Sequence, residues 1–352
     1  MSQRKPAKVL IIDDSALIRA LLTDVLQSDG RLEVVGTASD PYEARELIKK
    51  LNPDVLTLDI EMPRMNGIQF LKNLMRLRPM PVVMISTLTQ EGAPATLEAL
   101  ELGAVDFVPK PKNDSADALE RYRDEIVTKV AIAAKANLRF RGDSIGPSAA
   151  QRSPLPKGRA REGFLCAIGA STGGTEAIKD VITALPEGAP AIVVTQHIPE
   201  AFSLSFARRV DSLSAVHVYE AQQDQLIEPG NVYIAPGDSH LRVRKQGGKY
   251  RCKLDKEALV NRHRPSVEVL FDSVIAAAGD NALGVMLTGM GADGSAALLR
   301  MRESGCATIC QDEESSVVWG MPGVAVKLGA AQKVLPLNKI SGAIMREYFG
   351  GN

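Results

Sequence analysis

The stretch Phe164-Leu-Cys-Ala-Ile-Gly-Ala-Ser171-Thr-Gly-Gly174 joins an apolar run of strand length to a run with the apolar spacing of a helix. Within it, Gly169, Ser171 and Gly173 have G-x-S-x-G spacing. A serine on a tight turn between strand and helix is held out from the fold with its hydroxyl exposed. It also lies at a helix N-terminus, where unpaired backbone N–H groups can stabilise an oxyanion. The stretch therefore predicts an α/β domain in which Ser171 is a candidate nucleophile.

Strand and helix patterns alternate around this turn over residues 163–349, which predicts a second α/β domain with a parallel sheet. The predicted strands are 164–168, 191–195, 216–220, 232–235, 241–243, 282–288 and 307–311. The predicted helices are 175–184, 202–213, 266–278, 294–304 and 338–348. We expect residues 231–236 and 241–244 to form an antiparallel hairpin around Gly237-Asp238-Ser239-His240.

A serine nucleophile needs a base, and the chain contains 4 histidines. His197 and Asp293 each follow a predicted strand, so both are expected at the carboxyl edge of the sheet with Ser171. There His197 can accept the serine proton and Asp293 can fix the imidazole tautomer. The chain order Ser, His, Asp differs from that of α/β-hydrolases, so a lipase-type fold is not predicted.

Each of these assignments has an alternative. G-x-S-x-G alone is a weak signal, because small residues at such a turn also serve close packing or phosphate binding. His240, in the predicted hairpin turn, competes with His197 for the role of base, although the spacing favours His197. His217 is interpreted as a packing residue, and His263 as a substrate-binding or helix-capping residue. Asp293 is also well placed to be an ordinary N-cap of the helix that follows it.

Residues 8–110 contain a separate alternation of strands and helices, which predicts a doubly wound parallel sheet. Its predicted strands are 9–12, 34–38, 55–58, 82–85 and 106–108. Asp40-Pro41 is predicted to begin the second helix of this half, with Asp40 as its cap. Residues 112–135 are also predicted to be helical.

Polar residues gather where these strands end. Asp13 and Asp14 follow the first strand, Asp59 the third, Ser86 the fourth and Lys110 the fifth. The carboxyl ends of parallel strands share one edge, and clustered carboxylates repel one another unless a cation lies among them. Oxygen ligands of this kind suit Mg²⁺. A carboxylate in such a site can accept a phosphoryl group, whose oxygens Lys110 and the Ser86 hydroxyl can contact.

Composition restricts the class of protein. The chain has 352 residues, enough for roughly two domains, and a formal net charge of zero, which gives no reason to expect nucleic acid as a partner. Cys166, Cys252, Cys306 and Cys310 form no C-x-x-C pair and are predicted to be reduced, buried thiols. No apolar segment suggests a signal peptide or a membrane span, so a cytoplasmic protein without membrane insertion is expected. The Pro-, Ala- and Arg-containing stretch 138–162 is predicted to be an extended linker.

The first half resembles the receiver domain of two-component response regulators. The resemblance rests on Asp13-Asp14, Asp59 in Leu-Asp-Ile-Glu-Met-Pro-Arg-Met-Asn-Gly, Ser86, Phe107 and Lys110-Pro111. It implies a flavodoxin-like fold over 7–125, followed by a helix and linker over 126–162. It also implies that Asp59 takes phosphate from a chemotaxis histidine kinase, that Asp13, Asp14 and Asp59 hold Mg²⁺, and that Ser86 and Phe107 shift on phosphorylation.

Residues 163–349 resemble the catalytic domain of the chemotaxis protein-glutamate methylesterases. The matching segments are Ile168–Gly174, Gln196–Pro199, Val232–Gly237, Arg264–Val267 and Leu287–Gly294. The resemblance implies that Ser171, His197 and Asp293 are catalytic, that the Met290 amide stabilises the oxyanion, and that Thr172 supports the nucleophile. Arg264 is a candidate for attracting an acidic receptor surface.

Together the two resemblances imply an enzyme that removes methyl esters from glutamates of methylated chemoreceptors, deamidates receptor glutamines, and needs no cofactor for the esterase reaction. They further imply that the unphosphorylated receiver inhibits the esterase. Two alternatives stay open: a receiver-controlled esterase acting on a different carboxyl ester, and a response regulator whose second half only binds a partner such as DNA.

Overall fold

A computed structural model describes residues 5–63, 65–86, 92–110, 116–136 and 158–350. The chain divides into two compact units, Met1–Arg141 and Gly142–Asn352. Most of the linker predicted at 138–162 lies outside the described residues. None of the helices in the described ranges combines the length and the apolar character needed to cross a membrane.

The first unit is a five-stranded parallel sheet with strand order β2-β1-β3-β4-β5. This is the flavodoxin-like order, which confirms the predicted fold. The strands are β1 Ala7–Ile12, β2 Leu32–Ala38, β3 Val55–Asp59, β4 Val82–Ser86 and β5 Asp106–Pro109. The helices are α1 Ala16–Gln27, α2 Pro41–Leu51, α3 Gly67–Leu77, α4 Ala93–Glu101 and α5 Ala116–Ala133.

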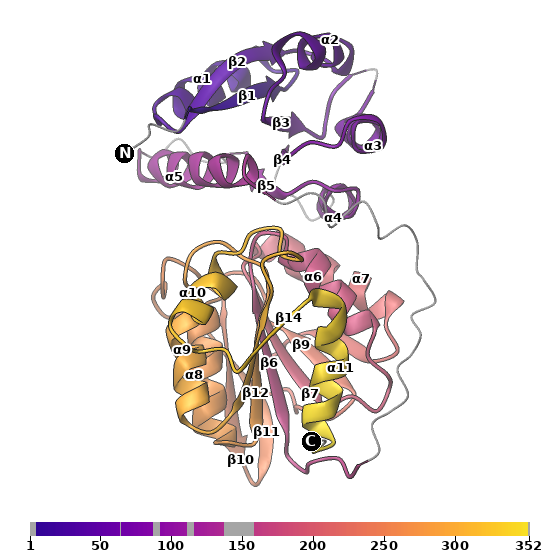
Figure 1. Ribbon diagram of the computed structural model, residues 1–352, viewed down its shortest axis with the longest axis vertical. Coiled ribbons are helices and arrows are strands. Elements are labelled where there is room, and N and C mark those ends of the chain that lie inside the picture. Colours follow the sequence, from indigo (N-terminus) through magenta and orange to yellow (C-terminus); the bar gives the residue numbers. More distant parts are fainter. Residues whose placement is uncertain (1–4, 64, 87–91, 111–115, 137–157, 351–352) are drawn as a thin grey trace. The chain divides into compact units, whose positions relative to one another are not determined.

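Helix boundaries in this unit follow their capping residues. The Asp40 carboxylate accepts hydrogen bonds from the N–H groups of Tyr42 (2.8 Å) and Glu43 (3.0 Å), and Pro41 begins α2, as predicted. Helix α5 packs against the sheet and continues to Ala133. It lies on one side of the sheet, and α3 and α4 lie on the other (Figure 1).

The second unit contains a seven-stranded parallel sheet of order β14-β13-β12-β6-β7-β9-β8 and a separate two-stranded antiparallel sheet. The strands are β6 Leu165–Ala170, β7 Ala191–Gln196, β8 His217–Glu220, β9 Asn231–Ile234, β10 His240–Gln246, β11 Lys249–Asp255, β12 Ala282–Met286, β13 Ala307–Gln311 and β14 Lys333–Leu335. The helices are α6 Gly174–Thr183, α7 Glu200–Leu213, α8 Val267–Ala278, α9 Ser295–Glu303, α10 Met321–Lys327 and α11 Leu337–Tyr348.

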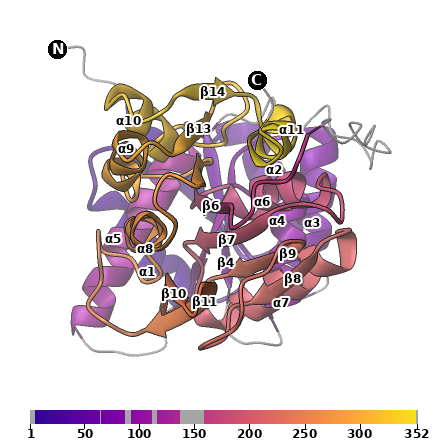
Figure 2. The same ribbon diagram turned by 90° about the horizontal axis from the view of Figure 1, so that it is seen from below.

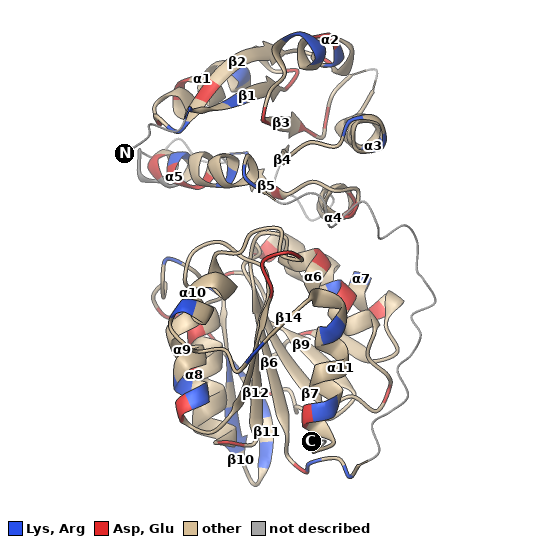
Figure 3. Ribbon diagram, in the orientation of Figure 1, with Lys and Arg blue, Asp and Glu red and all other residues tan. Residues whose placement is uncertain are grey.

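Helices cover both faces of the seven-stranded sheet. Helices α8, α9 and α10 lie on one face, and α6, α7 and α11 on the other (Figures 1 and 2). The central strands β6, β7 and β12 carry no charged side chain (Figure 3) and are buried along their whole length. This is the pattern of a parallel sheet buried on both faces. It places the carboxyl ends of these three strands side by side.

The predicted hairpin around Gly237–His240 is wrong. Strand β9 pairs in parallel with β7 and β8, and the antiparallel pair is β10 with β11. The turn of the true hairpin contains Gly247 (φ +58°) and Gly248 (φ +80°). Positive φ at both central residues is what a two-residue hairpin turn requires, and Gly-Gly supplies it at least cost. Strand β11 was not predicted, and neither were β14 and α10.

Two further predictions concern single residues. His217 begins the edge strand β8 with its side chain exposed, so its interpretation as a packing residue is wrong. All four cysteines are buried free thiols, as predicted. Burial raises the pKa of the Cys252 and Cys310 thiols to about 12, which leaves them protonated and inert.

Candidate functional site

Three neighbouring strands bring the candidate catalytic residues to one edge. In the sheet, β6 lies between β12 and β7, with Gly169 opposite Met286 and Ala170 opposite Gln196. Ser171 follows β6 directly and His197 follows β7 directly. Strand order alone therefore places the serine beside the histidine, as the sequence predicts for parallel strands.

The turn that carries Ser171 is fixed by backbone contacts. The Ser171 N–H donates to the Thr288 carbonyl (3.0 Å), and the Ser171 carbonyl accepts from Gly174 N–H (2.7 Å). Gly173, the N-cap residue of α6, has φ +74°, a conformation that residues with a side chain rarely adopt. A Cβ on Gly289 would lie 2.9 Å from the Ser171 Cβ, so the 288–290 loop packs directly against the nucleophile.

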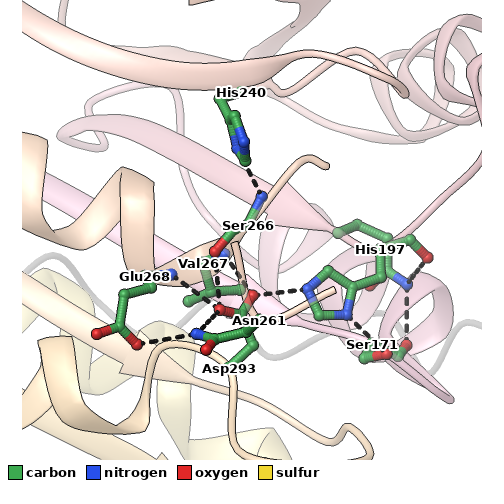
Figure 4. A network of polar contacts seen from close by, with 9 residues as sticks. Ser171, His197, His240, Asn261, Ser266, Val267, Glu268 and Asp293 are labelled. Carbon is green, nitrogen blue, oxygen red and sulfur yellow. Dashed lines mark hydrogen bonds and ion pairs between the residues drawn. The ribbon is translucent and has the colours of Figure 1, made fainter. Parts of the chain in front are cut away.

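The three candidate catalytic side chains form a continuous hydrogen-bonded line (Figure 4). His197 Nδ1 lies 3.1 Å from Ser171 Oγ, and His197 Nε2 lies 2.8 Å from Asp293 Oδ2. The imidazole is only 8% exposed. The nitrogens are exchanged relative to the chymotrypsin-type triad, in which Nε2 faces the serine and Nδ1 the aspartate. With Asp293 ionised, the proton belongs on Nε2, and Nδ1 is left as the acceptor for the serine hydroxyl.

Asp293 is a buried carboxylate with many donors. Besides His197, its oxygens accept hydrogen bonds from Asn261 Nδ2 (2.8 Å), Ser266 Oγ (2.8 Å), Val267 N–H (2.7 Å) and Glu268 N–H (3.4 Å). Burial opposes its ionisation most strongly, but the bonds from His197, Asn261 and Ser266 outweigh burial and hold the pKa of Asp293 well below its usual range. Asp293 is therefore an anion in the folded protein.

The same contacts show which helix Asp293 caps. The N-cap alternative placed it at the helix that follows, α9, but α9 has Gly294 at its N-cap position and no side-chain cap bond. Asp293 instead receives the first N–H groups of α8, whose own N-cap Ser266 turns its hydroxyl to Asp293. A negative charge at a helix N-terminus is stabilised by the helix dipole.

The other predicted candidates have different surroundings. His240 is fully buried and does not contact Ser171: its Nε2 donates to the Ala258 carbonyl (3.0 Å) and its Nδ1 accepts from Ser266 N–H (3.2 Å). The structure thus gives this competitor for the base role a purely structural position. The N-cap position of α8 belongs to Ser266, and the ring of His263 stacks on that of His197 with centroids 3.7 Å apart.

Arg264 is occupied within the protein. Its Nε and Nη2 donate to Asp238 Oδ1 (3.0 and 2.6 Å), and its Nη1 donates to the carbonyls of Lys256 and Glu257. A guanidinium whose donors are used internally has little capacity left for an acidic partner, so the structure does not support Arg264 as the residue that attracts a receptor surface.

Two supporting residues were not assigned from the sequence. Gln196 Nε2 donates to the carbonyls of Ser171 (2.9 Å) and His197 (3.2 Å), so it ties the two strand ends together. Asn261 has φ +52°, a left-handed conformation that asparagine tolerates well. The dipeptide Asn261-Arg262 was a signal for a tight turn, but nothing in the sequence shows which side chain that turn approaches.

The predicted oxyanion groups lie next to the nucleophile. Met290 follows Gly289, whose N–H donates to the Val318 carbonyl and whose carbonyl accepts from Gly320 and Met321 N–H. The backbone is thereby held on both sides, and the Met290 N–H has no acceptor among the described residues. Thr172 is buried, and its carbonyl accepts from Thr288 Oγ1 (3.0 Å).

In the first unit, the predicted acidic cluster forms as expected. Asp13, Asp14 and Asp59 each offer a carboxylate oxygen, and these oxygens all lie within 4.8 Å of one another. Asp13 and Asp59 are buried and Asp14 is exposed. Lys110 Nζ lies 3.0 Å from Asp13 Oδ2 and 2.9 Å from Asp59 Oδ2.

These residues fit a divalent cation. The buried oxygens Asp13 Oδ2 and Asp59 Oδ2 accept no hydrogen bond from any described group apart from their contact with Lys110. Burial, with a smaller contribution from Asp13, raises the pKa of Asp59 to about 6, although Lys110 acts in the opposite direction. One ammonium is thus shared between the two buried carboxylates, in a cluster that contains three. An all-oxygen set with excess negative charge and one exposed member suits Mg²⁺.

Of the two predicted switch residues, the structure describes the surroundings of Phe107 and the strand position of Ser86. Phe107 is buried, its carbonyl accepts from Lys129 Nζ (2.8 Å), and the same ammonium lies 5.3 Å from the ring centroid. Ser86 ends β4 opposite Pro109. The side chain of Ser86 lies outside what the structure describes.

Comparison with known proteins assigns a family to each of the two units. Residues 166–344 match the family model of the CheB methylesterase, and residues 9–121 match that of the response regulator receiver domain. The crystal structure of the Thermotoga maritima CheB methylesterase catalytic domain is 39% identical, with a TM-score of 0.52, and the match covers 53% of this chain and 99% of that one.

Curated relatives match along nearly the whole chain. A protein-glutamate methylesterase/protein-glutamine glutaminase of Saccharophagus degradans is 64% identical over 97% of this chain and 99% of its own length. One of Hahella chejuensis with the same description is 54% identical over 98% of this chain and 97% of its own. Both predicted resemblances are confirmed, and the chain belongs to the CheB methylesterase family, in the form in which the methylesterase domain follows a receiver domain.

Proposed function

We propose that this enzyme hydrolyses γ-carboxyl methyl esters of glutamate in methylated chemoreceptors, releases methanol, and deamidates receptor glutamines by the same chemistry. The observation that carries the proposal is the line from Ser171 Oγ through His197 to Asp293, with contacts of 3.1 and 2.8 Å. The relatives that share 54–64% identity are named for both activities. A cytoplasmic location agrees with substrates on the signalling helices of receptors.

In the first half of the reaction, Ser171 Oγ attacks the ester carbonyl and its proton passes to His197 Nδ1. The resulting imidazolium is stabilised by Asp293, which is held as an anion. The N–H groups of Met290 and Thr172 donate to the oxyanion. His197 then returns the proton to the leaving methoxide, methanol departs, and a glutamyl ester of Ser171 remains.

In the second half, a water molecule gives a proton to His197 Nδ1 and attacks the glutamyl ester. Collapse of this second tetrahedral intermediate returns the proton to Ser171 Oγ and frees the glutamic acid side chain, which loses its own proton to water. A glutamine side chain follows the same route, except that the leaving nitrogen takes the proton and departs as ammonia. Removal of one oxyanion donor in a comparable site lowers kcat by about 10²–10³.

We further propose that phosphorylation of Asp59 by a chemotaxis histidine kinase raises the esterase activity. Asp13, Asp14 and Asp59 would hold Mg²⁺, which offsets the negative charge of the carboxylates and of the phosphoryl oxygens. Lys110, within 3.0 Å of both buried carboxylates, is placed to contact a phosphoryl oxygen. A tenfold activation requires only about 1.4 kcal/mol of differential free energy.

The decisive experiment measures methanol release from methylated receptor membranes with and without acetyl phosphate as phosphodonor. Hydrolysis that increases with acetyl phosphate supports the proposal. Hydrolysis of p-nitrophenyl acetate without any methanol release from receptor favours the alternative, an esterase for a different carboxyl ester.

Asp59→Asn is expected to abolish the stimulation by acetyl phosphate while it leaves the basal rate of methanol release unchanged, because an amide cannot form an acyl phosphate. Removal of divalent cations with EDTA is expected to have the same effect on the wild-type protein. Asp29→Asn, which alters an exposed ion pair with Arg31 in the same unit, is the matched control and should retain full stimulation. If acetyl phosphate still stimulates Asp59→Asn fully, a residue other than Asp59 carries the phosphoryl group.

Deletion of residues 1–140 tests whether the receiver restrains the esterase. The shortened chain is expected to release methanol faster than the unphosphorylated full chain and to be insensitive to acetyl phosphate. A rate equal to or below that of the full chain contradicts inhibition by the receiver.

A further inference from the structure

A tight turn carries two side chains that contact the catalytic line, Asn261 and His263. Val260 N–H donates to the His263 carbonyl (3.1 Å), and His263 N–H donates to the Val260 carbonyl (2.9 Å). Between them, Asn261 has φ +52° and Arg262 has φ +68°. Two hydrogen bonds across two residues of positive φ are the pattern of a type I′ turn, which is a rigid connection.

One side chain of this turn holds the carboxylate. Asn261 Nδ2 donates to Asp293 Oδ1 (2.8 Å) and to Glu268 Oε2 (3.2 Å) (Figure 4). Glu268 is itself paired with Arg300 through its other oxygen (2.6 Å). The amide of Asn261 is therefore oriented by α8 on one side and delivers a charge-assisted hydrogen bond to the catalytic carboxylate on the other.

A second side chain of the same turn holds the imidazole. The His263 ring lies parallel to the His197 ring, with centroids 3.7 Å apart and an angle of 12° between the planes. His197 is hydrogen-bonded at both nitrogens in its own plane. Those bonds restrict sliding of the ring within the plane, and the stacked ring blocks its tilt out of the plane.

We propose that two side chains of the turn Val260–His263 are positioning residues for the reaction: Asn261 fixes the Asp293 carboxylate, and His263 fixes the plane of the His197 base. Asn261 acts through Asp293, and His263 acts through the His197 ring on which it stacks. The inference rests on the proposed serine mechanism. Its physical basis is that proton transfer requires donor and acceptor within a narrow range of distance and angle, so a small displacement of the base lowers the rate without changing substrate binding.

The sharpest variant is Asn261→Gly. Glycine adopts the positive φ of this position without strain, so the turn is kept while the bond to Asp293 is removed. We expect kcat for methanol release to fall about ten- to a hundredfold, with KM unchanged, because a hydrogen bond to a charged group is lost.

The neighbouring position offers a matched control. Arg262 also has positive φ, its side chain is exposed, and it makes no hydrogen bond or ion pair with any residue in the described ranges. Arg262→Gly adds the same backbone freedom to the unfolded chain, at the neighbouring position of the sequence. The proposal expects its kcat to equal that of the wild type.

The stacking contact is tested separately with two variants. His263→Ala removes the ring and is expected to lower kcat about fivefold, within the range of an aromatic contact. His263→Phe restores a flat ring and is expected to recover the wild-type kcat. This rescue distinguishes a stacking role from a role of the His263 nitrogens in binding substrate.

All variants are measured as full chains with acetyl phosphate present, together with the thermal unfolding midpoint and the rate at which a fluorophosphonate labels Ser171. The proposal is supported if Asn261→Gly is labelled slowly while its thermal unfolding midpoint equals that of Arg262→Gly. A kcat equal to that of Arg262→Gly, a loss confined to KM, or failure of His263→Phe to recover activity overturns it. If the wild type labels at Ser171 but releases no methanol from receptor, the proposed function fails and the positioning role is still measured by labelling.

Discussion

Ser171→Ala is expected to lower methanol release from methylated receptor by about 10⁶-fold, to the level of the background reaction, because loss of the nucleophile of a serine triad removes nearly all of its rate enhancement. The alanine keeps the backbone bonds of the turn to Thr288 and Gly174, which do not involve the hydroxyl. The rate should fall in kcat, since the substrate contacts are retained, and the fluorophosphonate label should be absent.

The receiver serves as an internal control in this experiment. Ser171→Ala should still incorporate phosphate at Asp59, which shows that the protein is folded and responsive. Ser212→Ala, on the exposed surface of α7, makes the same chemical change away from the site and should retain full activity. Methanol release by Ser171→Ala above background rules out covalent catalysis by this serine.

The sequence was sufficient for the part of the fold that depends on burial. Strands such as β6 and β7 are buried on every residue, so continuous apolar runs marked them and their ends. Because the carboxyl ends of parallel strands share an edge, the residues directly after them could be grouped without coordinates. Ser171, His197, Asp59 and the Asp13-Asp14 pair were all found in this way.

The sequence was insufficient where pairing is not dictated by burial. Strand β9 was assigned to a hairpin because it is close in sequence to β10, whereas in the structure it joins the parallel sheet beside β7. Gly247-Gly248 is a stronger signal for a two-residue hairpin turn than Gly237-Asp238, because both of its residues adopt positive φ at little cost. The polar strand β11, with its pattern of exposed and buried residues, offers little apolar signal to find.

The surroundings of the site could not be read from the sequence at all. Which nitrogen of His197 faces Ser171 depends on the direction from which Asp293 approaches. That Asp293 caps α8, and not the helix next to it in sequence, depends on how two helices pack. Asn261 lies 32 residues from Asp293 along the chain, and only the folded backbone brings them together.

Asp293→Asn is expected to lower kcat by about 10⁴-fold, the cost of placing an amide behind the histidine of a serine triad. The donors around Asp293 decide the outcome. Its Oδ1 accepts from the side chains of Asn261 and Ser266, and its Oδ2 accepts from Val267 N–H and from His197. An asparagine keeps most of these bonds only with its carbonyl oxygen at the Oδ1 position.

In that orientation the amide NH₂ faces His197 Nε2 and must donate to it, so the imidazole proton moves to Nδ1. A protonated Nδ1 faces Ser171 Oγ and cannot accept its proton, so the base is lost although every atom is near its original place. This orientation also sets the NH₂ against the Val267 N–H, and the opposite one sets it against the Asn261 amide and the Glu268 N–H, so each leaves donors facing one another. Either arrangement also removes a negative charge from the N-terminus of α8, at a cost of about 1 kcal/mol in folding free energy.

The measurement compares Asp293→Asn with Asp272→Asn, which makes the same change on α8 at an ion pair with Arg300. Both variants lose a carboxylate from this helix region, but only Asp293 contacts the base. Asp293→Asn should label slowly with fluorophosphonate and release methanol slowly at unchanged KM, while Asp272→Asn stays near wild type. The loss should far exceed that of Asn261→Gly, because the Asn261 bond positions the carboxylate whereas the carboxylate determines where the imidazole proton resides. A kcat of Asp293→Asn within tenfold of wild type means that the tautomer of His197 is set by something other than Asp293.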